Sequence, residues 1–271
     1  MYESFFSLKQ KPFAITSNPS FLFLSPRHKE ALAHMTYGIR ERVGFIEITG
    51  EVGTGKTTVC RALLNQLDEK TKSAFIFNSN LSEVQLIQTI VEDLGLKTAQ
   101  KNKGGLFSEL NRYLIDQMAL GHNVVVIIDE VQNLSLRTLE QVRMLSNLEC
   151  ENEKLLQIIL VGQPELSKKL ARPELRQLRQ RIAVRYHIGA LTRDETAQYI
   201  AHRLSLAGRA DAATLFDDTA IDEVFRYSGG IPRLINLVCG KSLLTGFVLE
   251  TRRIRFDIVK QSIIELEGVP A

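Results

Sequence analysis

Short apolar segments alternate with amphipathic segments along the first part of the chain. The apolar segments are rich in β-branched residues and bounded by turn or charged residues, as is typical of β-strands. They cover 45–49, 73–77, 123–129, 155–162 and 182–188. Helical periodicity lies between them, over 55–68, 82–94, 105–120 and 135–148. The second of these begins with the capping spacing of Ser82 and Gln85. Strands that alternate with helices predict an α/β fold with a parallel sheet covered on both faces.

The strand pattern stops after Ala190, and only helical patterns follow. "TRDETAQYIAHRLSLAG" begins with the capping-box spacing of Thr192 and Glu195 and ends at Gly208. Three further helical patterns lie near 217–228, 232–248 and 256–266. We therefore predict two domains: a core with an N-terminal strap over 1–189, and a smaller all-helical domain over 190–271.

The segment "GEVGTGKT" lies between a predicted strand and a predicted helix and matches the P-loop pattern for phosphate binding. Gly53 and Gly55 let the backbone curl so that successive N–H groups point at phosphate oxygens. Lys56 would reach the β- and γ-phosphates, and the Thr57 hydroxyl would ligate Mg²⁺. A chance glycine turn is the alternative, and the strand and helix on either side argue against it. The predicted nucleotide-binding residues are Gly50, Glu51, Val52, Gly53, Thr54, Gly55, Lys56, Thr57 and Thr58.

Two strands end in polar residues suited to nucleotide hydrolysis. "VVVIIDE" places Asp129 and Glu130 at the C-terminal end of a strand, where ligands bind in open α/β sheets. Asp129 would hold Mg²⁺ through water, and Glu130 would orient or deprotonate the attacking water. "LLQIILVGQPEL" places Gln163 after the next strand, where its amide would hold the water or sense the γ-phosphate. An ordinary turn residue would fit the position of Gln163 as well.

Positive charge is concentrated in one segment of the chain. The formal net charge is only +3, from 34 Lys and Arg against 31 Asp and Glu. The window 168–185 contains a single glutamate and the positive residues Lys168, Lys169, Arg172, Arg176, Arg179, Arg181 and Arg185. Nucleic-acid-binding proteins usually spread basic charge over a whole face, so this balance indicates one local basic site.

The cysteines and the N-terminal segment indicate in which cellular compartment the chain is found. Cys60, Cys150 and Cys239 are widely separated and show no ligand or redox spacing, which is typical of a reducing compartment without disulfides. The N-terminal segment differs from a signal peptide, and no segment approaches the roughly 20 apolar residues of a spanning helix. We expect a cytoplasmic chain with no direct membrane span, which a partner could recruit to the inner face of the membrane.

Several segments together resemble the AAA+ ATPases, and within them the ExeA (GspA) family of secretion-associated ATPases. They are "GEVGTGKTTVCRALL", "LLQIILVGQPEL", "RPELRQLRQRI" and "GGIPRLIN", along with the opening "MYESFFSLKQKPFAITSNPSFLFLSPRHKEAL". The resemblance implies a P-loop NTPase of AAA+ type, with a five-stranded parallel sheet flanked by helices and a helical lid. It also implies homo-oligomers, either rings or filaments, with ATP at the subunit interfaces. Short relatives resemble ATPases that accompany type IV pilus (MSHA) or exosortase gene sets. Regulators of the TnsC type, which form filaments on DNA, are more distantly similar.

In "YSGGIPRLIN", an arginine follows a turn that contains two glycines and a proline. Gly229 and Gly230 come after one predicted helix and Pro232 begins the next, so Arg233 lies in the first turn. An arginine in this place could reach back to the γ-phosphate. An ordinary surface arginine would fit the same pattern.

Arg181 lies at the junction between a helix and the last predicted strand. Helical spacing of apolar residues ends there, and strand alternation begins at Ile182. The resemblance to AAA+ proteins implies that this junction faces the ATP of the neighbouring subunit, so Arg181 would be the catalytic arginine acting in trans. The other arginines of the segment are assigned as follows: Arg179 as the alternate candidate, and Arg176 and Arg172 at the subunit interface.

These residues predict an ATP hydrolase that uses ATP and Mg²⁺, with Glu130, Lys56, Arg181 and Gln163 as catalytic residues. One interpretation is an oligomeric ATPase that drives assembly of a secretion, type IV pilus or surface-polysaccharide machine, with an envelope-machine protein as partner. A second is an ATP-dependent DNA-binding regulator of the TnsC type. A third is a nucleotide-gated switch with slow turnover. The resemblance further implies an adenine pocket around Pro12, Phe13 and Ile15, although an apolar strap packed on the core would explain the same residues.

Overall fold

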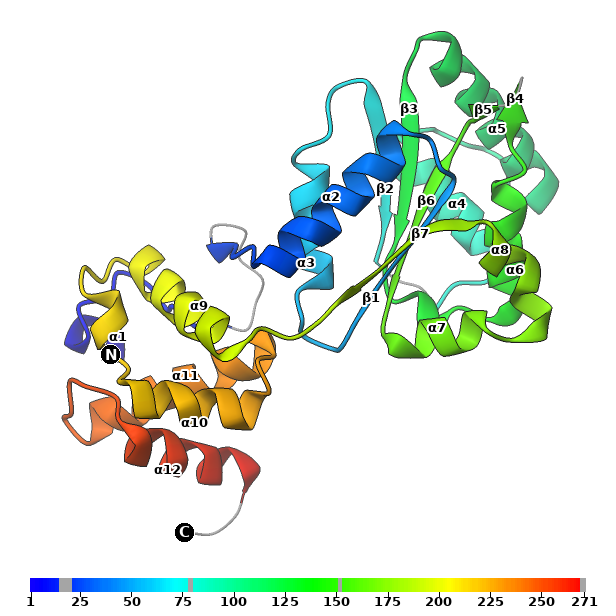
Figure 1. The fold of residues 1–271 in the computed structure, drawn as a ribbon. Coiled ribbons are helices and arrows are strands. Elements are labelled where there is room, and N and C mark those ends of the chain that lie inside the picture. The colour runs from blue at the N-terminus through cyan, green and yellow to red at the C-terminus, as the bar shows by residue number, and fades with distance from the viewer. Residues whose placement is uncertain (15–20, 78–79, 151–152, 269–271) are drawn as a thin grey trace. The chain divides into compact units, whose positions relative to one another are not determined.

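The computed structural model describes residues 1–14, 21–77, 80–150 and 153–268. The chain forms two compact units, whose elements are labelled in Figure 1. The sheet unit consists of Pro26–Gly50 and Val59–Ile188, and the lid unit consists of Met1–Ser25, Glu51–Thr58 and Gly189–Ala271. The N-terminal segment and the P-loop segment therefore pack with the C-terminal helices.

All five strands of the main sheet run parallel, in the order β2-β3-β6-β1-β7. They are β1 (Phe45–Gly50), β2 (Thr71–Ile76), β3 (Asn123–Ile128), β6 (Gln157–Gly162) and β7 (Ile182–Ile188). The five-stranded parallel sheet predicted from the sequence is thus confirmed. Because the strands are parallel, their C-terminal ends lie at one edge of the sheet. The P-loop follows β1 at that edge, Asp129 follows β3, and Gln163 follows β6.

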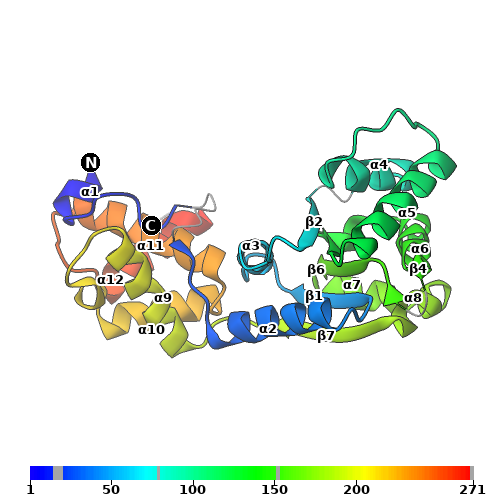
Figure 2. The ribbon, with the colours of Figure 1, turned by 90° about the horizontal axis from the view of Figure 1, so that it is seen from above.

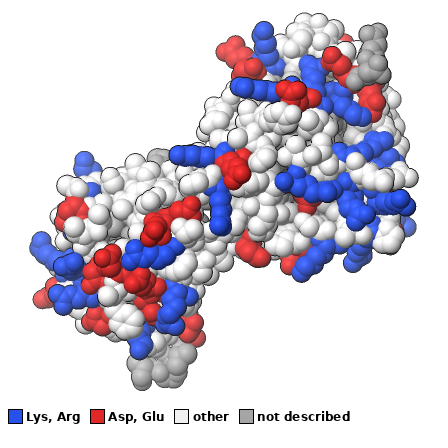
Figure 3. All heavy atoms as spheres, in the orientation of Figure 1, with Lys and Arg blue, Asp and Glu red and all other residues white. Residues whose placement is uncertain are grey.

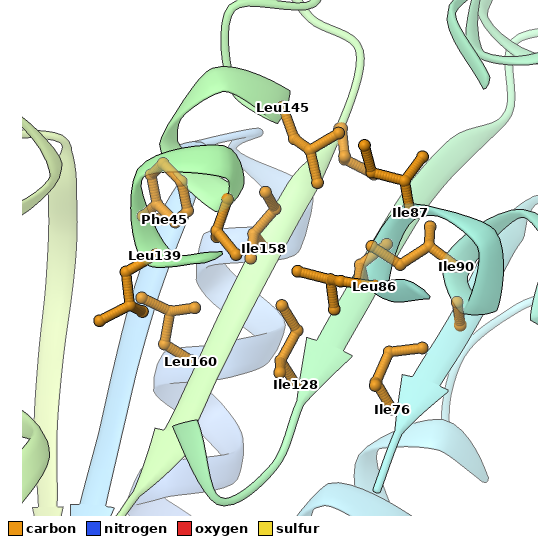
Figure 4. Close-up of a cluster of buried hydrophobic side chains, with 14 of the residues drawn as sticks. Phe45, Ile76, Leu86, Ile87, Ile90, Ile128, Leu139, Leu145, Ile158 and Leu160 are labelled. Atoms are coloured by element: carbon orange, nitrogen blue, oxygen red, sulfur yellow. The ribbon is translucent and has the colours of Figure 1, made fainter. Parts of the chain in front are cut away.

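One face of the sheet is buried beneath a layer of helices. Figure 4 shows Leu86, Ile87 and Ile90 of this layer beside Ile76 and Ile128 of the strands, and all five are buried in one hydrophobic cluster. The central strands read as continuous apolar runs because neither of their faces meets water. The helices on this face are α4 (Glu83–Asp93), α5 (Lys103–Ala119), α6 (Leu136–Leu145), α7 (Pro164–Leu170) and α8 (Arg176–Gln180), with the short 3₁₀ helices η2 (Val131–Asn133) and η3 (Pro173–Leu175).

The opposite face is covered by α2 (Pro26–Arg40) and by α3 (Lys56–Leu64), the helix that follows the P-loop. Figures 1 and 2 both show α2 lying along β7. The apolar pattern of the sequence predicts neither α2 nor the antiparallel pair of β4 (Glu149–Cys150) and β5 (Glu153–Lys154). The buried positions of α2 include His28 and Gly38, which interrupt its apolar periodicity.

The lid unit is helical, as predicted. Its elements are α1 (Tyr2–Phe5), α9 (Arg193–Leu206), η4 (Ala212–Thr214), α10 (Asp218–Ser228), α11 (Pro232–Val248) and α12 (Phe256–Glu267). The capping boxes expected at Thr192 with Glu195, and in the sheet unit at Ser82 with Gln85, both form. None of the helices in the described ranges is long and apolar enough to cross a membrane.

The N-terminal segment packs in the lid unit, whereas the sequence analysis had grouped it with the core over 1–189. Phe6 and Phe13 are buried in the same hydrophobic cluster as residues of α9 to α12. The Arg203 guanidinium on α9 donates from Nε to the carbonyl oxygen of Pro12 at 2.6 Å. Apolar periodicity cannot distinguish which of two cores an irregular segment joins, so this pairing depended on the tertiary structure. Ile15, placed by the sequence analysis near the adenine, lies outside the described residues.

Candidate nucleotide site and arginine face

The P-loop joins β1 to α3 through two glycines with left-handed backbone. The φ angles are +84° at Gly53 and +97° at Gly55, which favour glycine. Lys56 is buried, and its Nζ donates to the carbonyl oxygen of Glu51 at 2.9 Å. The Thr54 hydroxyl donates to the same oxygen, also at 2.9 Å. The loop therefore holds the lysine against its own backbone, at the start of a helix whose N–H groups can bind phosphate.

Within the lid unit, the start of α11 lies against the P-loop. The Arg233 backbone N–H approaches the carbonyl oxygen of Gly53 at 3.4 Å. A Cβ placed on Gly53 would come within 2.5 Å of the Arg233 Cβ, so a larger residue would push the helix away. Gly230 is needed just before, because a Cβ there would lie 1.9 Å from the carbonyl oxygen of Leu191. The arginine chosen from the sequence therefore lies next to the phosphate-binding loop.

Glu130 has a left-handed backbone, with φ 54° and ψ 37°, although it carries a side chain. Its N–H donates to Oδ1 of the buried Asp129 at 2.8 Å. A residue in this region of φ and ψ is costly, and such residues gather at functional sites. The turn directs two consecutive carboxylates differently: Asp129 is tied to the backbone, and Glu130 extends toward the loop after β6.

Two amide side chains bind the Glu130 carboxylate. Gln163 Nε2 donates to Glu130 Oε2 at 3.1 Å, and Gln132 Nε2 donates to the same oxygen. Gln132 Oε1 in turn accepts the backbone N–H of Gln163 at 3.1 Å. The structure therefore brings the two residues predicted on separate strands into direct contact. Gln132 was not predicted, because its only signal in the sequence is its position two residues after Glu130.

Lys169 supports this arrangement from α7. Its Nζ donates to the backbone oxygen of Gln132 at 2.8 Å and to that of Leu134. Burial, together with the nearby charge of Arg172, lowers the pKa of Lys169. This half-buried lysine belongs to the basic window found in the sequence, and its ammonium binds backbone oxygens of its own chain.

The arginines of the basic window differ in their surroundings. Arg181 donates from Nη1 to Ser146 Oγ and to Asn147 Oδ1, both at 2.5 Å, at the end of α6. Arg179 is exposed. Figure 3 shows Lys and Arg side chains gathered over the part of the sheet unit that carries α6 and α8. The exposed positive residues there include Arg137, Lys168, Arg172, Arg176 and Arg179.

The residues present fit a nucleotide with Mg²⁺. The described residues contain no group of three or more His, Cys, Asp or Glu side chains that could hold a metal ion. Mg²⁺ bound with a nucleotide does not need such a group, because it takes one or two carboxylates, water and phosphate oxygens. Thr57, at the start of α3, and Asp129, after β3, supply a hydroxyl and a carboxylate of the kind this ion uses.

Comparisons with known proteins show what this chain is similar to. Residues 39–170 match the family model described as an AAA domain. The chain carries an AAA domain. General secretion pathway protein A of Aeromonas hydrophila is 43% identical over 271 residues, which are 99% of this chain and 49% of that protein. The predicted resemblance to the ExeA (GspA) family is therefore confirmed, and the chain spans about half the length of this relative.

Solved structures show the same fold at low sequence identity. The Aeropyrum pernix ORC2 protein, in ADPNP and ADP complexes, has a TM-score of 0.71 and 18% identity, covering 95% of this chain and 72% of that chain. Drosophila ORC bound to DNA has a TM-score of 0.72 and 16% identity, and the match covers 97% of this chain and 66% of that chain. The Thermotoga maritima RuvB Holliday junction branch migration motor has a TM-score of 0.58 and 18% identity, and the match covers 88% of this chain and 68% of that chain. At these identities the likeness shows the fold alone, and it agrees with the predicted fold of a parallel sheet flanked by helices.

Proposed function

We propose that this chain is an oligomeric ATPase that binds and hydrolyses Mg-ATP to drive assembly of a secretion, type IV pilus or surface-polysaccharide machine. The main support for ATPase activity is the contact of Gln163 with Glu130. It lies beside Asp129, at the sheet edge where the P-loop begins. The link to an envelope machine rests on similarity to General secretion pathway protein A.

In this proposal the P-loop binds the phosphates and Glu130 activates water. Backbone N–H groups over 50–58, with the Lys56 ammonium, would neutralise phosphate charge, and Thr57 and Asp129 would hold Mg²⁺. Bound Mg²⁺ would neutralise charge that develops on the phosphates. Glu130 would accept a proton from water, and the Gln163 amide would orient that water relative to the γ-phosphate.

The arginines complete the proposal. Arg233 would report the γ-phosphate to the lid unit, because its helix begins against the P-loop. Arg181 would act on the nucleotide of a neighbouring subunit, with Arg179 as the alternate. Arg181 binds Ser146 and Asn147, directly after α6, so it would have to exchange these partners for phosphate oxygens.

The test is ATP hydrolysis measured against protein concentration, with and without DNA. We expect the rate of ATP hydrolysis per subunit to rise as subunits associate and to be the same with and without DNA. Strong stimulation by DNA with a steep salt dependence would instead support the DNA-binding regulator. Tight ATP binding with negligible turnover at every concentration would support a nucleotide-gated switch.

The trans role of Arg181 has its own test. Arg181→Ala should bind ATP normally and lose hydrolysis, and mixing it with Glu130→Gln should restore part of the activity. In mixed oligomers, some interfaces would combine an intact Glu130 with an intact Arg181. If mixing restores nothing, the trans assignment is wrong.

A further inference from the structure

Glu47 places a carboxylate in the middle of an otherwise apolar strand. All six residues of β1, FIEITG, are buried, and the Glu47 side chain is only 5% exposed. Burying an ionised carboxylate is costly unless it is paired and hydrogen-bonded. An apolar residue would satisfy the core at this position, so the partners of Glu47 indicate what it does.

Each oxygen of the Glu47 carboxylate binds a different element of the sheet unit. Oε1 accepts the Ser167 hydroxyl of α7 at 2.6 Å, and Oε2 accepts Nε of Arg185 on β7 at 3.0 Å. Glu47 and Arg185 are also direct neighbours in the register of β1 and β7. The carboxylate thus ties β1 to one covering helix and to the edge strand β7.

Arg185 extends this link to the end of α8. Its Nη2 donates to the backbone oxygen of Arg179 at 2.8 Å. Arg179 is in the last turn of α8, and Arg181 is the residue just after the helix. The guanidinium is planar with a fixed fork of donors, so a bond from Nε to Glu47 also fixes where Nη2 points. A lysine could keep the ion pair with Glu47, but one ammonium could not reproduce this fork.

We propose that Glu47 and Arg185 are positioning residues that hold the end of α8, and with it Arg179 and Arg181, for action on a neighbouring subunit's nucleotide. This inference rests on the proposed function, in which one of those two arginines acts in trans. The second oxygen of Glu47 holds α7, whose N-cap Gln163 binds Glu130. One buried carboxylate therefore positions both helices that adjoin the proposed catalytic groups.

The decisive variant is Arg185→Lys, because it keeps the charge pair and loses the bond to Arg179. We expect hydrolysis per subunit to fall about tenfold, since misplacing a catalytic group by a fraction of an ångström has effects of this order. ATP affinity should change by less than about twofold, because the P-loop is untouched. The melting temperature should stay near that of the parent chain. Arg185→Gln, which also loses the charge, should lose more hydrolysis.

The matched control is Arg226→Lys in the lid unit. Arg226 also pairs with a buried glutamate, Glu223, but the pair is three residues apart on one helix. Its guanidinium therefore joins no second element, and we expect hydrolysis to be unchanged. A purely structural view of arginine–glutamate pairs predicts similar effects at Arg185 and Arg226.

An experiment that mixes two variants can distinguish a positioning role of Arg185 from a general weakening of the fold. Arg185→Gln mixed with Glu130→Gln should regain hydrolysis, because the Arg185→Gln sites would then face an intact arginine of the other variant. If Arg185→Gln merely weakened the fold, its own sites would be impaired and mixing would restore nothing. That second result would overturn the inference.

The outcomes also separate this inference from the proposed function. Normal hydrolysis by Arg185→Lys and Arg185→Gln, with loss in Arg179→Ala or Arg181→Ala, would overturn the positioning role and leave the ATPase intact. Normal hydrolysis by both Arg179→Ala and Arg181→Ala would remove the trans arginine, and the inference with it. Absence of hydrolysis in the parent chain would overturn the proposed function itself.

Discussion

In the lid unit the residues proposed to bind phosphate are held by backbone geometry, whereas in the sheet unit those proposed to promote hydrolysis are held by side-chain hydrogen bonds. Gly53 and Gly55 shape the P-loop through positive φ. Glu130, by contrast, is held by the amides of Gln132 and Gln163. A substitution at Glu130 should therefore impair hydrolysis while leaving nucleotide binding intact.

The two units also bury charge in different ways. Glu47 of the sheet unit pairs with an arginine of the adjacent strand. In the lid unit, the Arg203 guanidinium binds the backbone oxygens of Pro12 and Ala14, and its Cζ lies 4.6 Å from the Phe21 ring centroid. A buried carboxylate paired with a half-exposed arginine joins regular elements of a sheet, whereas a buried arginine bound to carbonyl oxygens fastens an irregular segment to a helix.

The largest expected effect is that of Lys56→Ala. Removing the ammonium from the P-loop should weaken ATP binding at least about a hundredfold, because a buried cation no longer neutralises phosphate charge. Fluorescence titration with a labelled nucleotide measures this. Lys103→Ala, which removes an exposed lysine paired with Glu83, is the matched control and should bind normally. Equal affinities for both variants would contradict the role of Lys56.

Glu130→Gln should separate binding from hydrolysis. The amide is isosteric but cannot accept a proton, so hydrolysis should fall by about 10² to 10⁴. Affinity for ATP should stay close to that of the parent chain, as measured by the same titration. Glu140→Gln, at a partly exposed glutamate of α6, is the control. Normal hydrolysis by Glu130→Gln would show that the assignment is wrong.

Arg203→Leu should destabilise the lid unit by about 1–3 kcal/mol, because the carbonyl oxygens of Pro12 and Ala14 lose their donor. Urea denaturation measures the loss, and limited proteolysis within the first 25 residues reports release of the N-terminal segment. Lys260→Leu, at an exposed position of the same unit, should stay within about 0.5 kcal/mol. No difference between the two variants would mean that apolar packing alone holds the segment.

The smallest expected effect is at Tyr186, which joins β7 to α2. Its hydroxyl donates to Glu30 Oε2 at 2.7 Å, and burial, followed by this hydrogen bond, raises its pKa from 10.0 to about 12. Tyr186→Phe should cost about 0.5–1.5 kcal/mol near neutral pH. The folded pKa lies above the unfolded one, so the contribution is complete below pH 10 and is lost as the pH rises toward 12.

This pH dependence can be measured by denaturation of the parent chain and of Tyr186→Phe from about pH 8 to about pH 12, which runs from below the ordinary pKa of 10.0 up to the shifted pKa. The free-energy difference between the two proteins should shrink across the upper half of that range. A free-energy difference that stays constant with pH would show that the Tyr186 hydroxyl has the same pKa in the folded and unfolded states.

Much of the arrangement of the candidate nucleotide site could be predicted because its signals are local. The P-loop is a turn followed by a helix, and its glycines are required by backbone angles that neighbouring residues set. Asp129 and Gln163 follow apolar strands, and parallel strands bring their ends to one edge. Contact between Gln163 and Glu130 follows from that topology.

Gln132 and Glu47 could not be recognised in the same way. Gln132 lies in a polar turn, where many residue types are accepted, and it matters only because the loop after β6 comes within reach. Glu47 interrupts an apolar strand, and its purpose depends on Arg185, which is 138 residues away in the chain. Nothing in the local pattern pairs these two positions.

The sequence by itself determined the alternation of strands and helices, the P-loop and the order of the polar residues that follow the strands, because these depend on short-range periodicity and turn chemistry. Only the tertiary structure decided which unit the N-terminal segment joins, which arginine is bound to α6 and which is exposed, and how a buried carboxylate connects α7 to α8. Those features depend on contacts between residues far apart in the chain, where the free energy of burying a charge or a carbonyl oxygen is set by whatever partner the fold supplies.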